Sequence, residues 1–365
     1  MNDKNYREAI LVFGNYHPDL PIATQDENEF VVELLTGGLI NQTFKVSSPL
    51  ASPFLLQQIN HHVFTKPEEV QQNYIYIWEY AEFEFTGLHL PAPIYFNKTK
   101  SLFIDTKGNY WRAFEFIDDA RMLTLAEKPA QAKATAKAFA KFTSAFDEFN
   151  VDLLKPVIPG FHNLSFRYLQ FEEAVNGEFY ERMPKSLPLI EELKKRERYK
   201  DFYEFVLESP DEFPKRVMHH DAKIANALFS KKSGKVICLV DFDTVMPGYF
   251  FSDSGDMIRS MACSVDESST DFKNIAVRKD FYLAITEGYL SAMKEQFTAA
   301  EKKNIHSVGL LMIYMQALRY LTDYLNGDVY YRVNYAEQNF DRAKNQLILL
   351  QKLELYLEKE FHFKV

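Results

Sequence analysis

The sequence lacks the features that mark several large classes of protein. Only two of its 365 residues are cysteines, Cys238 and Cys263, so it offers neither a disulfide scaffold nor a cysteine zinc site. It contains no run of about 18 apolar residues that could span a membrane, and its first residues have no apolar signal core. Its formal net charge is −9, whereas binding to a nucleic-acid backbone needs a basic surface. We therefore expect a cytoplasmic protein with no membrane or nucleic-acid partner.

What is present indicates a globular chain with two parts. Apolar residues make up 47% and charged residues 25%, which is ordinary for a folded protein, and the length suits about two domains. Helical spacing is found from Lys66 to Ala81, and Pro91-Ala92-Pro93 is expected to end the connection that follows. From Pro129 onward helical spacing dominates, and one of the later helices is expected to begin near Asp256. Most strand patterns lie earlier, at 30–35, within 36–46, and at 53–60, 101–104 and 110–117. We predict an α+β fold with an N-terminal lobe over 1–120 and a mainly helical C-terminal lobe over 121–365, and the oligomeric state stays open.

The stretch 217–243 holds the strongest chemical signal. It reads His-x-Asp221-x-x-x-x-Asn226, then a short turn, then an apolar strand that ends at Asp241. A hairpin across the turn brings these three side chains to one end of a small sheet. Phosphoryl transfer needs a carboxylate that orients the attacking hydroxyl, and an amide oxygen and a carboxylate that hold Mg²⁺. A capped turn before a buried strand explains His-x-Asp alone equally well, but the added Asn226 and Asp241 favour a kinase.

A second signal is the Gly37-Gly38 turn between two predicted strands. Glycine lets backbone N–H groups approach closely, so such a turn can lie over the phosphates of a nucleotide. A plain hairpin is the commoner explanation of a glycine turn by itself. The nucleotide reading gains weight because the stretch 217–243 independently implies a nucleotide.

These pieces resemble the aminoglycoside phosphotransferase/choline kinase superfamily over about residues 25 to 345. Several phrases look like its N-acetylhexosamine 1-kinase branch, among them GGLINQTF, HHDAKIANALF, VDFDTVMPG and RYLTDYLNGDVYY. The resemblance implies a bilobal protein-kinase-like fold with a small antiparallel-sheet lobe and a larger helical lobe. It also implies an enzyme that uses ATP and Mg²⁺ to phosphorylate the anomeric hydroxyl of N-acetylglucosamine or N-acetylgalactosamine, giving the sugar 1-phosphate.

The resemblance assigns roles residue by residue. Asp221 is the expected catalytic base, and His219 is expected to brace the loop that carries it. The metal is expected at Asn226, Asp241 and Asp243, and positioning of the active-site network is the other role open to Asp243. The nucleotide is expected at Gly37, Gly38, Asn41, Gln57 and the hinge residues Glu115, Phe116 and Ile117. The sugar is expected at Arg259, Arg319, Asp323 and Tyr330, each of which could equally be a core residue or part of a structural ion pair, such as one between Arg319 and Asp323.

Two positions depart from the superfamily pattern. Its members carry a lysine on the third strand that holds the α- and β-phosphates, and Gln57 takes the nearest place here. His220 stands where glycine or asparagine is usual. The first departure leaves open which residue anchors the nucleotide, and whether Glu68 or Glu69 has a pairing role. It also keeps two alternatives: a kinase of the same fold for choline, homoserine, methylthioribose or an aminoglycoside, and a catalytically weak nucleotide-binding protein.

Overall fold

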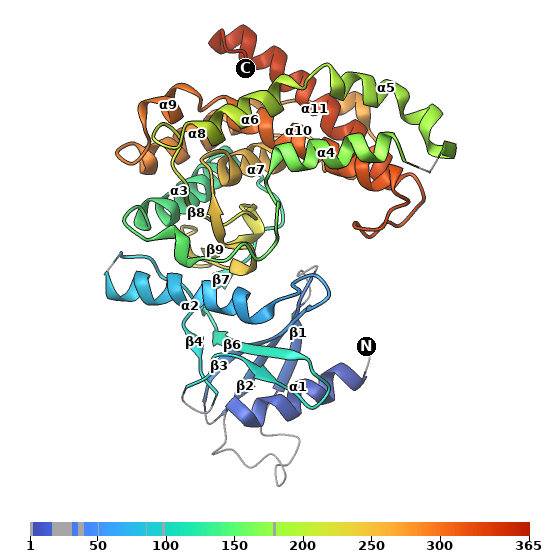
Figure 1. Ribbon diagram of the computed structural model, residues 1–365. Coiled ribbons are helices and arrows are strands. Elements are labelled where there is room, and N and C mark those ends of the chain that lie inside the picture. The colour runs from blue at the N-terminus through green and yellow to red at the C-terminus, as the bar shows by residue number, and fades with distance from the viewer. Residues whose placement is uncertain are drawn as a thin grey trace.

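The computed structural model describes residues 3–16, 31–35, 40–49, 51–84, 86–96, 99–177 and 180–365. Within these residues, the N-terminal part is an antiparallel sheet in the order β1-β2-β3-β6-β4, and β5 also pairs with β6 (Figure 1). Its strands are β1 (Val31–Leu35), β2 (Gln42–Ser48), β3 (Ala51–Ile59), β4 (Pro93–Ile94), β5 (Phe103–Ile104) and β6 (Tyr110–Glu115).

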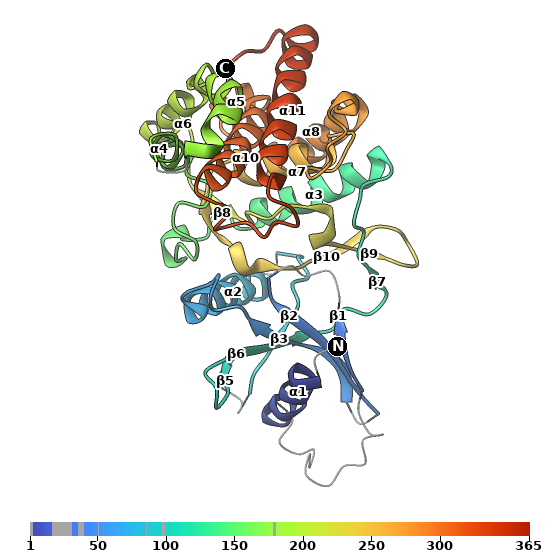
Figure 2. The ribbon, with the colours of Figure 1, turned by 90° about the vertical axis from the view of Figure 1, so that its right-hand side faces the viewer.

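The two faces of this sheet have different neighbours. One face carries Phe54 and Trp111, which pack in a common apolar cluster with residues of α1 (Asp3–Tyr16). Successive side chains of a strand point to opposite faces, so Gln57 and its cross-strand partner Arg112 lie on the other face. That second face is turned towards α2 (Pro67–Phe83), which separates the sheet from the rest of the chain (Figure 2).

Helices make up most of the C-terminal part (Figure 1). They are α3 (Pro129–Ala145), α4 (Leu164–Val175), α5 (Met183–Lys194), α6 (Arg198–Glu208), α7 (Phe251–Met261), α8 (Lys279–Met293), α9 (Ala299–Lys303), α10 (Ser307–Leu325) and α11 (Gln338–Phe361). Helix α10 is buried on nearly all sides, as expected for a helix with few polar positions. It lies at the centre, with α4, α7 and α11 packed around it.

Five short strands lie between the sheet and the helices. They are β7 (Ala120–Arg121), β8 (Arg216–Met218), β9 (Ala227–Ser230), β10 (Val236–Leu239) and β11 (Met246–Gly248). β7 pairs with β9 and not with the N-terminal sheet. The chain has therefore crossed to the C-terminal part by residue 120, and we keep a division at 120/121 as a proposal.

The architecture confirms the predicted α+β, protein-kinase-like fold, and two local predictions need correction. β4 was expected to be part of a connection because of its prolines, yet it forms an edge strand, where a proline costs no ladder hydrogen bond. Helix α7 was expected to begin near Asp256, but it begins at Phe251. Gly255 lies inside it because α7 approaches α10 closely: a Cβ there would lie 2.4 Å from Val308 O.

No helix in the part of the chain that the structure describes combines the length and the apolar character needed to cross a membrane.

Candidate functional site

Two antiparallel strand pairs, β8 with β11 and β9 with β10, hold the segment that carries Asp221. The predicted hairpin forms, and Val240 N donates to Asn226 O at 3.0 Å. Asn226 Nδ2 donates to the backbone oxygen and to Oδ2 of Asp221, both at 2.9 Å. Asp241 follows β10, and the charge of Asp221 acts on its carboxyl group. The structure therefore brings together the three side chains that the motif spacing placed at one end of a sheet.

Only one oxygen of the Asp221 carboxylate is used by neighbouring side chains. Lys223 Nζ lies 2.7 Å from Oδ2, the oxygen that also accepts from Asn226. Oδ1 accepts no hydrogen bond from any described residue, so it is available to a bound hydroxyl. Burial alone would raise the pKa of Asp221, but the Lys223 charge and these hydrogen bonds outweigh it and hold that pKa below its usual value. Asp221 is thus an ionised carboxylate at neutral pH.

Lys223 was missed by sequence reasoning, although it lies inside the quoted motif. Its side chain is partly exposed and pairs with Asp221, and its charge also interacts with Asp241 and Asp256. A cation two residues after the expected base was the available signal. Lys223 provides positive charge close to two carboxylates at the place where a phosphoryl group would be transferred.

Asp253 at the start of α7 fixes the backbone of the same loop. Its Oδ2 accepts from His219 N at 3.0 Å, and its Oδ1 accepts from His220 N at 2.7 Å. Burial raises the pKa of Asp253 to about 7, against the lowering effect of these two bonds. Sequence reasoning also missed this residue, since nothing local links it to a loop more than 30 residues earlier.

His219 is a fully buried, neutral residue that ties the loop to β10. Its Nε2 lies 3.0 Å from Val240 O, which as a carbonyl must accept, so Nε2 carries the proton. Its ring packs edge-on against Phe139. Burial lowers the pKa of His219 to about 4. These contacts fit the bracing role that the resemblance implies.

The backbone conformation of His220 explains why glycine or asparagine is usual at this position. Its backbone has a φ of 64°, in the left-handed region that those two residues adopt most readily. Its ring lies over Gly248, where a Cβ would come within 2.6 Å of His220 Nε2. The bulky ring is therefore accommodated by a glycine on the neighbouring strand β11.

Replacing His220 with asparagine should make stability less sensitive to acid. Burial lowers the pKa of His220 to about 4, so between pH 6.5 and 4 the unfolded chain binds a proton there that the folded chain does not. Wild type then loses stability as the pH falls, and the variant lacks this loss. Urea unfolding should show that the free energy of unfolding of wild type, relative to that of the variant, falls by about 2 kcal/mol between pH 7.5 and pH 5. A difference between the two proteins that is independent of pH would contradict the neutral, buried state of His220.

Asp241 is the carboxylate best placed to bind a metal ion. It has a positive φ of 69°, a strained backbone conformation of the kind found at functional sites. The side chain of Asp241 is exposed to solvent. Even so, desolvation by the surrounding protein raises the pKa of Asp241 to about 7, and the charges of Asp243 and Asp221 contribute to this rise. Among the described residues, no three His, Cys, Asp or Glu side chains form a metal-binding group. Asp241 and the free Oδ1 of Asn226 still fit Mg²⁺, which takes few protein ligands and completes its shell with water and phosphate oxygens.

Asp243 differs from Asp241 because both of its oxygens are occupied. Oδ1 forms an ion pair with Arg112, and Oδ2 accepts from Asn41 Nδ2. Asn41 in turn accepts from Asn60 N at 2.9 Å. Asp243 thus joins the segment after β10 to the N-terminal sheet. Of the two roles left open for it, the contacts favour positioning over metal binding.

The remaining residues expected to bind the nucleotide lie on the central strand β3 and at the end of β6. Gln57 Nε2 donates to Thr43 Oγ1 at 2.9 Å on the face turned towards α2. Glu115 N donates to Ala92 O at 2.9 Å, and the expected hinge residues Phe116 and Ile117 follow directly after β6. Gly37 and Gly38 lie outside the described residues.

The four residues expected to hold a sugar have unlike surroundings. Arg259 is ion-paired with Asp256 at 2.8 Å and with Glu267, so its structural explanation holds. Asp323 accepts from Tyr330 N at 2.7 Å, Tyr331 N at 2.9 Å and Asn339 Nδ2 at 2.8 Å. Its carboxylate therefore ties down the backbone after α10 and does not pair with Arg319.

Arg319 has no carboxylate partner among the described residues. Its Nη1 donates to Gln316 Oε1 at 3.1 Å, and its guanidinium lies 5.0 Å from the centre of the Phe161 ring and 5.7 Å from that of Tyr330. Arg167 on α4 likewise bonds only to Phe161 O and Gln170. Burial and the nearby charge of Arg319 lower the pKa of Arg167 to about 10. Two guanidinium groups thus lie close together without a negative charge between them.

A cavity of about 190 Å³ opens between these two arginines. Its lining consists of Arg167, Gln170, Arg319, Thr322, Asp323, Asn326, Val329, Tyr330 and Tyr331. Phe161 and His162 connect it to the loop of Asp221, since the ring of His162 lies 5.0 Å from that of His220. No sequence motif marks Arg167 or His162, because only tertiary packing brings α4 and the residues before it next to α10.

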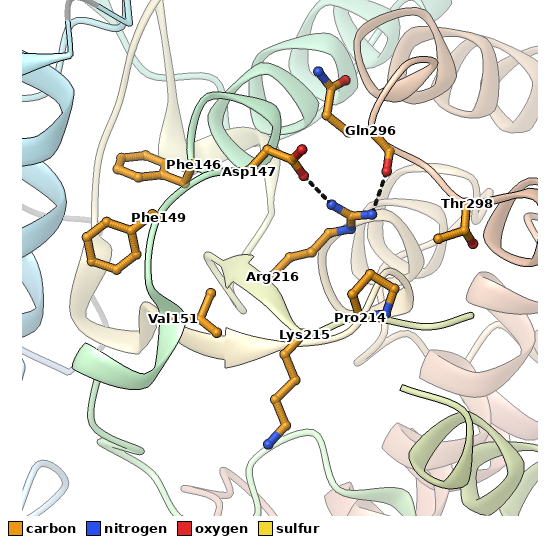
Figure 3. A pocket seen from close by; sticks show the side chains of 9 residues that line it. All are labelled: Phe146, Asp147, Phe149, Val151, Pro214, Lys215, Arg216, Gln296 and Thr298. Atoms are coloured by element: carbon orange, nitrogen blue, oxygen red, sulfur yellow. Dashed lines mark hydrogen bonds and ion pairs between the residues drawn. The ribbon is translucent and has the colours of Figure 1, made fainter. Parts of the chain in front are cut away.

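Figure 3 shows a larger cavity, of about 280 Å³, that contains none of the expected site residues. Arg216 projects into it from β8 and is held by Asp147 at 2.6 Å and by Gln296 O at 2.6 Å. The same guanidinium also pairs with the buried Glu301. Because Arg216 is paired with Asp147, Gln296 O and Glu301, its charge is not available to a ligand in this cavity.

Comparisons with known proteins agree with this geometry. The model of the phosphotransferase enzyme family matches residues 31–279. The fold is similar to that of a microcompartment-associated aminopropanol kinase, with a TM-score of 0.66 at 15% identity over 97% of this chain and 98% of that chain. It is also similar to choline kinase from Cryptosporidium parvum Iowa II, with a TM-score of 0.57 at 18% identity over 97% of both chains. An amicoumacin kinase in complex with AMP-PNP and Ca²⁺ has a TM-score of 0.52 at 13% identity over 88% of both chains.

Proposed function

This chain belongs to the phosphotransferase enzyme family, and we propose that within it the chain is a kinase for a neutral N-acetylhexosamine. The reaction transfers the γ-phosphoryl group of ATP to the anomeric hydroxyl of N-acetylglucosamine or N-acetylgalactosamine and yields the sugar 1-phosphate. The family membership supports phosphoryl transfer. The choice of acceptor rests on the charge of the cavity lined by Arg167 and Arg319.

The observation that carries the proposal is the unpaired Arg167 and Arg319 in that cavity. The only carboxylate in its lining, Asp323, already accepts three N–H donors. The cavity therefore presents positive charge, which opposes the cationic amino group of an acceptor such as an aminopropanol or choline. A neutral sugar offers hydroxyl and acetamido oxygens to the guanidinium groups, and the rings of Tyr330 and Tyr331 offer an apolar surface for its ring.

Asp221 performs the chemical step in this proposal. Lys223 and Asn226 hold Oδ2, so Oδ1 is left to orient the sugar hydroxyl and to take its proton. Phosphoryl transfer depends mainly on position and on neutralisation of charge. Lys223 supports the second by placing its ammonium group beside the reacting groups.

Asn226 and Asp241 would hold the divalent cation, and backbone groups of the hinge residues Phe116 and Ile117 would hold the adenine. A bound Mg²⁺ supplies positive charge against the nucleotide's phosphates. The amicoumacin kinase that shares this fold is bound to AMP-PNP and Ca²⁺, which supports a nucleotide and a divalent cation here. The predicted partners are thus ATP and one small sugar.

The acceptor is tested by measuring ADP release from ATP and Mg²⁺ over a panel of hexosamines, amino alcohols, methylthioribose, homoserine and aminoglycosides. We expect the N-acetylhexosamines to give the highest kcat/KM, and phosphorus NMR of the product to show the coupling of a sugar 1-phosphate. A preference for a cationic acceptor, or a 6-phosphate product, would contradict the proposal. ATP binding without any product over the panel would favour the catalytically weak alternative.

Replacing Arg319 with glutamine should weaken the sugar and spare the nucleotide. The change removes a charge-assisted bond worth about 1.5–3 kcal/mol, so the KM for the sugar should rise roughly 10- to 100-fold. The KM for ATP should stay unchanged. Arg198→Gln is a matched control, because Arg198 lies outside the cavity and pairs with Glu354. Equal effects of the two variants would remove Arg319 from the acceptor site.

A further inference from the structure

The face of the N-terminal sheet that is turned towards α2 carries a buried arginine that no sequence motif singled out. Arg112 lies on β6 directly opposite Gln57 of β3. Both Arg112 and its ion-pair partner Asp243 are only 3% exposed. An unpaired charge in such a place is costly. Arg112 and Asp243 therefore stabilise each other, and their ion pair lies where the N-terminal sheet meets the segment that carries Asp241.

The contacts of Arg112 hold its guanidinium in one orientation. Nε and Nη2 donate to Gln57 Oε1 at 2.9 and 2.6 Å, and Nη2 also pairs with Asp243. Nη1 makes a single long bond, of 3.4 Å, to Gln71 Oε1 on α2. A guanidinium has five N–H donors, so Nη1 keeps donor capacity that these neighbours do not use.

Gln71 adds an independent sign that this place is incomplete. Its side chain is 3% exposed, and its Nε2 has no hydrogen-bond partner among the residues that the structure describes. Buried amide groups are normally paired. Glu68 and Glu69, for which a pairing role was left open, have other partners. Glu68 forms a side-chain hydrogen bond with Tyr110, and Glu69 pairs with Lys66. The site thus combines unused donors on Nη1 of Arg112 and on Nε2 of Gln71.

Two other cations lie near the place expected for the nucleotide, and each already has a partner. Lys223 is committed to Asp221. Lys45, on the same sheet face, lies 4.5 Å over the ring of Phe116, at the hinge. Gln57, at the place of the superfamily's lysine, is neutral. Arg112 is the remaining cation held next to Asp243, and through it to the segment that carries Asp241.

We propose that Arg112 binds the phosphates of the nucleotide through Nη1, supported from β3 by Gln57. This assignment rests on the proposed function only in assuming that ATP occupies this cleft. Gln57 then acts as a positioning residue, and the positive charge comes from the neighbouring strand. The Asp243 ion pair keeps the guanidinium in place before ATP binds.

The assignment is tested by calorimetric binding of ATP and of adenosine in the presence of EDTA, so that metal coordination does not contribute. Loss of the phosphate contact in Arg112→Gln should weaken ATP roughly 10- to 100-fold and leave adenosine within about twofold. Arg112→Lys should lie between wild type and Arg112→Gln, because it keeps the charge but not the guanidinium fork. Comparing the two ligands on one sample cancels any loss of folded protein.

The double variant Arg112→Gln/Asp243→Asn covers the case in which the single variant does not fold, since it leaves no unpaired buried charge. It should show the same selective loss of ATP. An unchanged ratio of ATP to adenosine affinity in the folded variants, or a larger loss in Lys45→Gln, would overturn the assignment while ATP binding by wild type stands. A wild type that binds no ATP even when Mg²⁺ replaces EDTA would overturn the proposed function itself.

Discussion

Replacing Asp221 with asparagine is expected to lower kcat roughly 10²- to 10⁴-fold, the usual contribution of a general base. Asparagine has nearly the same shape, and its oxygen can still accept from Lys223 and Asn226. It cannot take a proton, so the hydroxyl that Oδ1 orients in the wild type would remain a poor nucleophile. The KM for ATP should change little, because no proposed nucleotide contact is removed. Steady-state kinetics with ADP detection measures both values.

The surface variant Asp152→Asn is the matched control for Asp221→Asn, since it makes the same chemical change at an exposed carboxylate. It should leave kcat unchanged. Turnover of Asp221→Asn within tenfold of wild type would remove Asp221 from the role of base. A parallel loss of ATP affinity would instead indicate that Asp221 shapes the nucleotide site.

Replacing Arg216 with methionine is expected to lower the free energy of unfolding by about 3–5 kcal/mol, the cost of breaking a buried ion pair by removing one partner. Glu301 is fully buried and pairs with Arg216 at 2.9 Å, so its carboxylate would be left without a cation. The variant also frees Asp147 and Gln296 O, the two other partners of the guanidinium (Figure 3). Urea unfolding followed by circular dichroism measures the loss.

Two further variants separate the buried pair from general charge effects. Lys133→Met breaks the exposed pair with Glu287, and exposed pairs are worth only about 0–1 kcal/mol. Arg216→Met/Glu301→Leu removes both buried charges and should recover part of the loss. Recovery should be incomplete, because Glu301 also caps α9 through Thr298. A single variant no less stable than Lys133→Met would show that Arg216 does not hold the junction of β8, α3 and α9.

Local spacing was sufficient for the catalytic loop because its geometry is itself local. A hairpin fixes the positions of its own ends, so Asp221, Asn226 and Asp241 could be expected together from the turn between two apolar segments. The same reasoning predicted β3, β6, α2 and α3, whose patterns are periodic and long. It failed at β4 and at the start of α7, where Pro93 and Gly255 are tolerated for reasons of tertiary position.

The residues that sequence reasoning missed act through contacts between distant segments. Arg112 left a usable signal, since a single arginine in an otherwise apolar strand requires a partner. Its partner, Asp243, could not be named, because many acids along the chain satisfy that requirement equally. Asp253 and Arg167 left no signal at all. Their positions depend on how α7 meets the loop of Asp221 and how α4 packs on α10.

Period and spacing along single segments were enough to predict the class of fold, the chemistry of the loop at 217–243 and the identity of the expected base. Which charges are paired could be learned only from the folded chain. Arg259 and Asp323 are bound to protein partners, whereas Arg167 and Arg319 face a cavity together. Pairing depends on distances between segments that are far apart in the chain, and side-chain periodicity contains no information about those distances.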